Sequence, residues 1–338
     1  MYSFMNDYSE GAHPRILELL SKINFEQNSG YGLDVHSEKA KKYIRTLIKR
    51  EDADIHFIPG GTQVNLLTIS SFLRPHQSVI AVDTGHIIGH EAGAIEATGH
   101  QIIIAPGVDG KLTPDAIQKA LDANSEEYTT QPRMVYISNT TELGTLYTKD
   151  ELTALHHICK EKGLSLFLDG ARLGSALTSK LNDLEISDIA DLVDVFYIGG
   201  TKNGALLGEA LVILREDLKE DFRYLIKQRG AMLAKGFLLG VQFEALFEDN
   251  LFFELASHAN NMAEKIANIF IDAGIKFYTE PLSNQLFPIF SNDLIEKMSK
   301  EFSFIKQKKI DEENTVVRFV TSWATTEESV DALRRFFA

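Results

Sequence analysis

The sequence predicts an α/β protein with a mostly parallel sheet covered by helices on both faces, followed by a smaller α+β domain. Short runs rich in Val, Ile, Phe and Tyr are each followed by a segment with helical spacing or a helix cap. The run LSLFL is apolar at every position but one, as in a strand buried on both faces. This alternation stops near residue 250. The six predicted strands cover 54–58, 78–82, 101–105, 133–138, 164–168 and 194–198.

Two helix starts between these strands carry recognisable caps. Thr113 precedes Pro114, and Thr148 precedes Asp150 and Glu151. A capping hydroxyl, a proline at the first helical position and acids in the first turn all stabilise a helix N-terminus. We therefore expect helices to begin at both places, as crossovers between parallel strands.

The last ninety residues show a different pattern. A long helix is predicted over 250–273, then strand-like pieces in NQLFPIF and TVVRFVTSW, then a closing helix over 328–337. This order predicts a smaller α+β lobe. No Gly/Ser-rich or Pro-rich linker precedes it, so we expect the two lobes to pack together with a cleft at their junction.

Composition narrows the classes of function. The chain has 338 residues, 44% of them hydrophobic, and a formal charge of -14, which disfavours nucleic acids and anionic membranes as partners. Cys159 is the sole cysteine, so an internal disulfide or a multi-thiolate metal site cannot form. With no leader-like start and no membrane-spanning run, we expect a cytoplasmic protein.

Polar residues follow the predicted strands, at the edge where open parallel sheets bind ligands. The first set is Gly60, Gly61 and Thr62, which leads into the helical stretch VNLLTISSFL. A glycine-rich turn that opens a helix presents backbone N–H groups that can hold a phosphate. A tight turn with Thr62 as an ordinary N-cap is the structural alternative.

An acid and a lysine form the next two sets. Asp169 ends LSLFL, where a buried carboxylate needs a cationic partner such as a protonated ring nitrogen or Arg172. Lys202 follows DVFYIGGT, where desolvation would lower its pKa and free the amine to form an imine with a carbonyl cofactor. Thr201 would add a phosphate contact. The alternative for Lys202 is an ordinary solvated side chain.

The fourth set begins with His86, in a helix predicted over 85–99. An imidazole there can stack on a planar cofactor or move a proton near neutral pH, or simply cap the helix. His86, His90 and Glu91 would also permit a metal site, although their spacing is not HExxH. Arg318, inside VVRFV, either pairs with an internal acid or presents its guanidinium to a carboxylate in the cleft.

Taken in order, these residues resemble the aspartate aminotransferase fold of pyridoxal-phosphate enzymes (fold type I). More narrowly, they resemble the low-specificity L-threonine aldolase group of the β-eliminating lyase family. The matching stretches are NDYSEG, GYG at 30–32, PGGTQVNL, GHIIGHEAGA, LFLDGARL, GGTKNG and VVRFVT. The resemblance implies an N-terminal arm over 1–15, a seven-stranded large domain over 16–249 that binds pyridoxal 5'-phosphate (PLP), and a small domain over 250–338. It also implies a homodimer or homotetramer.

The resemblance implies a role for each candidate residue. Lys202 would hold the cofactor aldehyde as an internal aldimine, and Asp169 would keep the pyridine nitrogen protonated so that the ring can act as an electron sink. His86 would stack on the ring as a third catalytic residue. The phosphate would be held by Gly60, Gly61, Thr62 and Thr201, and the amino-acid substrate by Asn6, Arg172 and Arg318.

The chain departs from the family pattern at two places. Relatives are expected to begin with Ser-Asp-Thr where this chain has Asn6-Asp7-Tyr8, and to carry a histidine where it has Thr141 and Glu142. The resemblance implies that this histidine contacts the substrate hydroxyl. The catalytic base is therefore unassigned, with His86, or a water that it orders, as the first candidate.

Three hypotheses follow. The first is a PLP-dependent carbon–carbon lyase that cleaves a threonine-like β-hydroxy-α-amino acid to glycine and an aldehyde. The second keeps PLP but catalyses β-elimination or transamination on another amino acid, because fold-level similarity cannot choose between reactions that share one electron sink. The third is a metal-dependent hydrolase built on His86, His90, Glu91, His156 and His157.

Overall fold

The computed structural model describes residues 2–338, and its central feature is a seven-stranded sheet with the strand order β2-β8-β7-β6-β5-β3-β4. The strands are β2 (Asp54–Ile58), β3 (Gln77–Val82), β4 (Ile102–Ala105), β5 (Gln131–Ser138), β6 (Ser165–Asp169), β7 (Val195–Gly199) and β8 (Glu209–Ile213). Strand β8 runs against the others, because it pairs antiparallel with both β2 and β7. The mostly parallel α/β sheet and all six predicted strands are confirmed, whereas β8 was missed.

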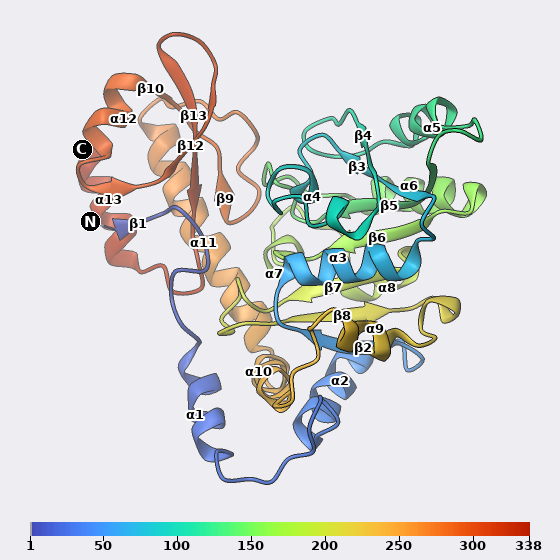
Figure 1. Cartoon of the computed structure of the whole chain (residues 1–338). Coiled ribbons are helices and arrows are strands. Elements are labelled where there is room, and N and C mark those ends of the chain that lie inside the picture. The colour runs from blue at the N-terminus through green and yellow to red at the C-terminus, as the bar shows by residue number, and fades with distance from the viewer. Residues whose placement is uncertain (1) are drawn as a thin grey trace.

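Each face of the sheet has its own apolar core. Along β6, Leu166 and Leu168 pack on one face and Phe167 on the other, which explains the nearly continuous apolar run. Helices α2 (Val35–Ile48), α5 (Pro114–Ala123), α6 (Lys149–Lys162), α8 (Ile186–Leu192) and α10 (Phe237–Phe247) contribute to the first core. Helices α3 (Gly61–Phe72) and α9 (Phe222–Gln228) cover the second face, on the viewer's side in Figure 1.

The predicted helix starts are confirmed, but one predicted helix is wrong. Thr113 caps α5 through the backbone N–H of Ala116, and Thr148 forms a capping box with Glu151 at α6. The helix expected over 85–99 is reduced to the single turn α4 (His86–Gly89) and the 3-10 turn Glu96–Thr98. It is interrupted because Ala92 and Gly93 adopt φ values of 51° and 76°, which a right-handed helix does not contain.

The C-terminal part has a third apolar core. The predicted long helix is α11 (Leu251–Asp272), and the predicted closing helix is α13 (Glu327–Phe337). Phe270, Phe290 and Phe319 pack together between α11 and a small antiparallel sheet. The remaining elements here are β9 (Gln285–Leu286), β10 (Ile289–Ser291), α12 (Asn292–Met298), β11 (Phe302–Ser303), β12 (Ile305–Lys309) and β13 (Asn314–Val320). The α+β character predicted for this part is confirmed.

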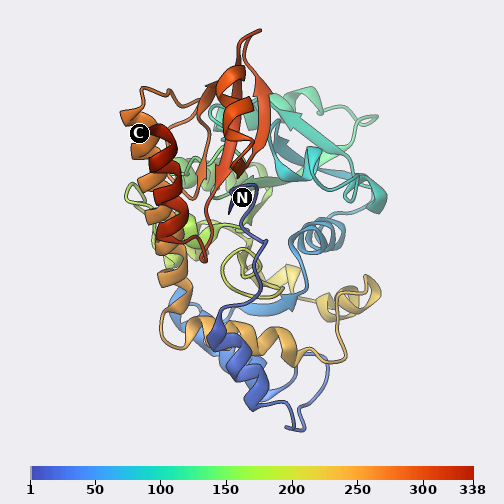
Figure 2. The same ribbon diagram turned by 90° about the vertical axis from the view of Figure 1, so that its left-hand side faces the viewer.

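The N-terminal segment joins the two parts. Strand β1 (Tyr2–Ser3) pairs in parallel with β11, and Phe4 is buried in the C-terminal core. The chain then passes along the sheet edge to α1 (Pro14–Lys22), as Figure 2 shows. The small helix α7 (Leu173–Leu177), which follows β6, packs against α11 and so also joins the two parts. Within residues 2–338, no helix has both the length and the apolar character that a membrane span requires.

Candidate active site

The carboxyl ends of β2, β3, β5, β6 and β7 line a cavity of about 360 Å³ at one edge of the sheet. Most of the predicted site residues contribute to its wall, namely Gly60, Gly61, Thr62, His86, Asp169, Arg172, Thr201 and Lys202. They come from the ends of four strands, β2, β3, β6 and β7, and the fold brings them together around one cavity.

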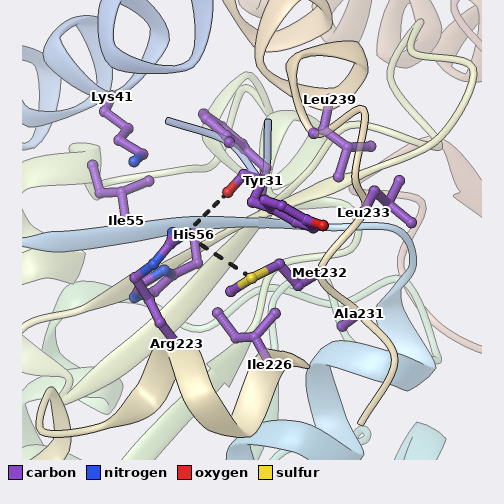
Figure 3. A pocket seen from close by; sticks show the side chains of 13 residues that line it. Tyr31, Lys41, Ile55, His56, Arg223, Ile226, Ala231, Met232, Leu233 and Leu239 are labelled. Carbon is purple, nitrogen blue, oxygen red and sulfur yellow. Dashed lines mark hydrogen bonds between the residues drawn. The ribbon is translucent and has the colours of Figure 1, made fainter. Parts of the chain in front are cut away.

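A second, smaller cavity lies beside β2, near the segment that joins α9 to α10 (Figure 3). Arg223 donates a hydrogen bond from Nη2 to the backbone oxygen of Tyr31 over 3.1 Å, and Met232 lies close by. The cavity measures about 30 Å³. Since one water molecule needs ~10–15 Å³ of such space, it has room for only a few waters. None of the predicted site residues lines it, so the larger cavity, which most of them line, is the candidate active site.

One end of the larger cavity is suited to an anion. Gly60 is the N-cap of α3, and no side chain accepts a hydrogen bond from the first-turn N–H groups of this helix. Because this turn lines the cavity, these N–H groups can bind an anion there. Thr62 lies inside the first turn, and the alternative that it is an ordinary N-cap is wrong. Several other helices also begin without a side-chain cap, so it is the position of the α3 start in the cavity wall that suits it to an anion.

Asp169 is held by a dense set of donors at the end of β6. Tyr136 and Tyr197 donate their hydroxyl hydrogens to its two oxygens over 2.6 and 2.5 Å, and Asn65 Nδ2 donates over 3.1 Å. Burial acts to raise the pKa of Asp169, but the positive charge of His86 and the two tyrosine hydroxyls hold it below its usual value. Asp169 is therefore a fixed, ionised carboxylate that can stabilise a cationic group in the cavity.

Lys202 lies in the same cavity and is partly buried. Burial and the nearby charge of Arg172 lower the pKa of its amine, although the carboxylates of Asp7 and Asp169 oppose this shift. A lysine with a lowered pKa is nucleophilic closer to neutral pH, as carbonyl chemistry requires. The alternative that Lys202 is solvated is therefore wrong.

His86 is the first residue of the one-turn helix α4, and its side chain lines the cavity. Its Nδ1 lies 2.8 Å from Oε1 of the buried Glu91, which in turn accepts a hydrogen bond from Asn65. Through Asn65, this network reaches Asp169. His86 does not cap a helix with its side chain.

Arg172 has a different partner from the one considered from the sequence. Its Nε and Nη2 atoms donate to the carboxylate of Asp7 over 2.7 and 3.0 Å, so the Asp169–Arg172 ion pair is wrong. Asp7 is 1% exposed and also accepts a hydrogen bond from Asn284. Asp7 was not among the predicted site residues. The signal that could have found it was the position of an acid within the NDYSEG stretch.

Of the other predicted substrate residues, Arg318 lies near the site and Asn6 does not enter the cavity wall. The pKa of Arg318 is lowered by burial and by the charge of Arg172, which places the two guanidinium groups in one electrostatic environment. Within residues 2–338, Nε of Arg318 is buried without a hydrogen-bond partner. Asn6 instead accepts hydrogen bonds from its neighbours Tyr8 and Ser9, and Tyr8 is the residue that lines the cavity.

Thr141 and Glu142 lie in different surroundings. Thr141 is buried against Thr145, with 2.7 Å between their hydroxyl oxygens, whereas Glu142 lines the cavity. Glu142 accepts hydrogen bonds from the Ser138 hydroxyl and the His86 backbone N–H. Burial, together with the charge of Asp169, raises its pKa. Glu142 is thus the ionisable group at the place where the resemblance implies a histidine.

The residues considered for a metal site are not arranged as one. His86 and His90 lie with ring centroids 5.5 Å apart, but His156 on α6 donates from Nδ1 to the carbonyl oxygen of Leu192 on α8. No group of three or more His, Cys, Asp or Glu side chains in the described part of the chain could hold a metal ion. The hypothesis of a metal-dependent hydrolase has no ligand set to support it.

The residues present are suited to PLP. The bare start of α3 offers N–H groups to a phosphate, Asp169 offers a carboxylate to a pyridinium nitrogen, and Lys202 offers a nucleophilic amine to an aldehyde, all in one cavity. These residues match three of the polar groups of that cofactor.

Comparison with known proteins identifies the family of the chain. Residues 8–291 match the family model described as "Beta-eliminating lyase". The chain is 32% identical to a low specificity L-threonine aldolase of Pseudomonas aeruginosa over 98% of its own length and 96% of the relative.

Solved structures give the same result. The fold matches a threonine aldolase of Leishmania major with a TM-score of 0.97 and 51% identity, over 100% of both chains. It also matches an aspartate aminotransferase of Thermus thermophilus with a TM-score of 0.74 over 100% of this chain and 91% of the other; at 12% identity this likeness shows the fold alone. The chain belongs to the β-eliminating lyase family of PLP-dependent enzymes, on the fold that this family shares with the aminotransferases.

Proposed function

We propose that this protein is a PLP-dependent carbon–carbon lyase that cleaves a threonine-like β-hydroxy-α-amino acid to glycine and an aldehyde. The observation that carries the proposal is the presence of Asp169 and Lys202 in the wall of one cavity, next to the uncapped start of α3. The threonine aldolases of P. aeruginosa and L. major, which cover nearly the whole chain, support the choice of substrate class.

When bound, PLP supplies an electron sink for the negative charge that develops at the substrate α-carbon. Lys202 would supply the amine that holds the cofactor through its aldehyde. Asp169 holds the proton at the pyridine nitrogen, because an ionised carboxylate beside that atom favours its charged form. Tyr136 and Tyr197 keep Asp169 in place and ionised.

We assign the substrate α-carboxylate to Arg172 and Arg318. Asp7 occupies Nε and Nη2 of Arg172, which fixes the guanidinium plane and leaves Nη1 for the substrate. The buried, unpartnered Nε of Arg318 is available for the same anion. Fixing the carboxylate sets the orientation of the bonds at the α-carbon, and this orientation decides which bond breaks.

We assign the proton of the β-hydroxyl group to His86 or Glu142. His86 lines the cavity, and Glu91 holds its ring through Nδ1, which leaves Nε2 to accept or donate a proton. The raised pKa of Glu142 brings this carboxyl closer to the working pH of a general base. Ser138 and the His86 backbone both donate to Glu142 Oε1.

A homodimer or homotetramer remains a prediction from the resemblance, and a cytoplasmic location remains a prediction from the sequence. Sedimentation of the active protein tests the first. A mass equal to one chain with full activity would contradict it.

The absorption spectrum of the purified protein tests the proposed cofactor. Added PLP should produce a visible band that Lys202→Ala lacks, and glycine should shift that band in the wild type. A colourless wild type with PLP, or a Lys202→Ala variant with unchanged activity, would overturn the proposal.

The products separate the remaining alternatives that share the cofactor. Threonine, allo-threonine and phenylserine should each yield glycine and an aldehyde. Pyruvate and ammonia from serine would instead indicate β-elimination, and an exchanged amino group would indicate transamination.

A further inference from the structure

A buried acid lies beside the end of the cavity that is suited to an anion. Glu209, the first residue of β8, is 5% exposed and lines the cavity together with Gly60, Gly61 and Thr62. In the sheet it pairs directly with Ile58, the last residue of β2 before the turn into α3. A carboxylate at this place would repel the phosphate that the start of α3 is arranged to bind.

Glu209 also controls the predicted phosphate ligand Thr201. The Thr201 hydroxyl donates its single hydrogen to Glu209 Oε1 over 2.8 Å and accepts a hydrogen bond from the Gly208 N–H. The backbone N–H of Gly200 donates to the other oxygen, Oε2, over 2.9 Å. While Glu209 is ionised, Thr201 therefore has no hydrogen left to offer an anion.

Protonation of Glu209 removes the repulsion of the phosphate and also frees the hydroxyl hydrogen of Thr201. A proton on Oε1 can be donated to Thr201 Oγ1, which retains a second lone pair for the Gly208 N–H. The Thr201 hydroxyl hydrogen then turns toward the cavity, and the negative charge next to the anion disappears. The proton comes from solvent, and no covalent bond other than the O–H bond of the carboxyl changes.

We propose that Glu209 takes up one proton when the cofactor phosphate occupies the cavity, and that this proton switches Thr201 from donating to Glu209 to donating to the phosphate. Glu209 is in this sense a positioning residue, because it acts through Thr201. The proposal rests on the proposed function only in naming the phosphate, since the same relay would serve any dianion at this end of the cavity.

The surroundings of Glu209 support a proton uptake near neutral pH. Burial raises the pKa of Glu209 to about 7, against the opposing effects of the Thr201 hydrogen bond and the Lys202 charge. The ionisable groups that face it are Lys202, Asp169 on β6 and Tyr197 on β7, while β2 presents the apolar Ile58. A second anion in this setting would favour the neutral carboxyl further.

Sulfate binding to the cofactor-free full-length protein tests the proposal, because sulfate remains a dianion throughout the relevant pH range. Binding is measured by calorimetry between pH 6 and 9. Above pH 7, proton uptake should lower the wild-type affinity by up to about tenfold per pH unit. The Glu209→Gln variant, which has a neutral isosteric side chain, should show a slope that is smaller by about one proton.

Two controls separate Glu209 from its neighbours. Lys202→Ala and Glu142→Gln each remove one further ionisable group of the cavity whose pKa is shifted, and both should keep the wild-type slope. A slope that is lost in Lys202→Ala but retained in Glu209→Gln would overturn the proposal, as would a wild-type affinity that does not change with pH.

A measurement on the wild type alone needs no variant to fold. Calorimetry at pH 8 in two buffers with different ionisation enthalpies counts the protons taken up with sulfate, and we expect close to one. A count of zero would overturn the proposal. A PLP absorption band together with a zero count would leave the proposed function intact, so the two can fail separately.

Discussion

Asp7 and Arg172 form a two-pronged ion pair across 165 residues of sequence, with Nε–Oδ2 and Nη2–Oδ1 distances of 2.7 and 3.0 Å. Asp7 belongs to the N-terminal segment, and Arg172 follows β6 directly after Asp169 and two small residues. The pair therefore connects the N-terminal segment to a residue in the cavity wall.

Removing the acid should destabilise the fold. Asp7→Ala leaves the charge of Arg172 buried and unpaired, and breaking a buried pair in this way costs ~3–5 kcal/mol. Asp7→Asn keeps an acceptor and should cost less. Urea unfolding at pH 7 measures both, and equal stability of Asp7→Ala and wild type would contradict the prediction.

The same pair should make the wild type sensitive to acid. Burial acts to raise the pKa of Asp7, but the charges of Arg172 and Lys202 hold it below its usual value. Because the folded-state pKa is depressed, this stabilisation is present above the unfolded pKa of about 3.9 and is lost as the pH falls through the folded value. Between pH 5 and pH 3, Asp7→Asn should lose less stability than the wild type. Parallel losses in urea titrations would contradict this.

Arg172 should also tune the reactivity of Lys202. Burial and the charge of Arg172 lower the pKa of Lys202, so Arg172→Gln should raise that pKa and slow the reaction with PLP near pH 7.5. The rate of appearance of the PLP band between pH 6 and 10 reports the change. Arg318→Gln is a matched control, since Arg318 is not among the main causes of the Lys202 shift. Identical pH profiles for wild type and Arg172→Gln would show the assignment to be wrong.

The tyrosines at Asp169 should matter less than the carboxylate itself. Asp169→Asn removes the charge that favours a protonated ring nitrogen, and we expect cleavage to slow by at least about a hundredfold. Tyr136→Phe removes one of the hydroxyl donors while Tyr197 and Asn65 remain, so we expect a loss below about tenfold. Steady-state kinetics with threonine, together with the cofactor spectrum, compares them. A larger effect of Tyr136→Phe would reverse the assignment.

Gly170 should be intolerant of a side chain. A Cβ at this position would meet the backbone oxygen of Tyr197 at 1.8 Å, because β6 and β7 approach closely where Gly199 donates to Gly170. Gly170→Ala should therefore cost several kcal/mol, on the order of 4–5, and lower the yield of folded protein. At Gly11 a Cβ would meet nothing within 4 Å, so Gly11→Ala should unfold at the wild-type urea concentration.

The sequence predicts the fold and the central residues of the site because both depend on local patterns. Apolar runs identify six strands, and the polar residues that follow them converge since parallel strands end at one edge. Strand β8 was missed because EALVI follows β7 by a short loop and lacks a preceding helix. Glu209 was missed for the same reason.

What the sequence could not predict depends on contacts between distant segments. The partner of Arg172 is Asp7 and not Asp169, a choice made by the path of the N-terminal segment along the sheet edge. The interrupted helix after His86 depends on positive φ at Ala92, a residue type that rarely adopts it. Whether Thr141 or Glu142 replaces the expected histidine depends on which of the two side chains faces the cavity. Both belong to a loop, and the sequence of a loop does not show the direction of its side chains.

The parallel pairing of β1 with β11 has a practical consequence for handling the protein. A purification tag fused ahead of Tyr2 would emerge beside the two-stranded sheet of β1 and β11, a few residues from Asp7. Ala338 is exposed after α13, so an affinity handle placed there projects into solvent. Expression vectors for this enzyme should therefore carry the tag after Ala338 and not ahead of Tyr2.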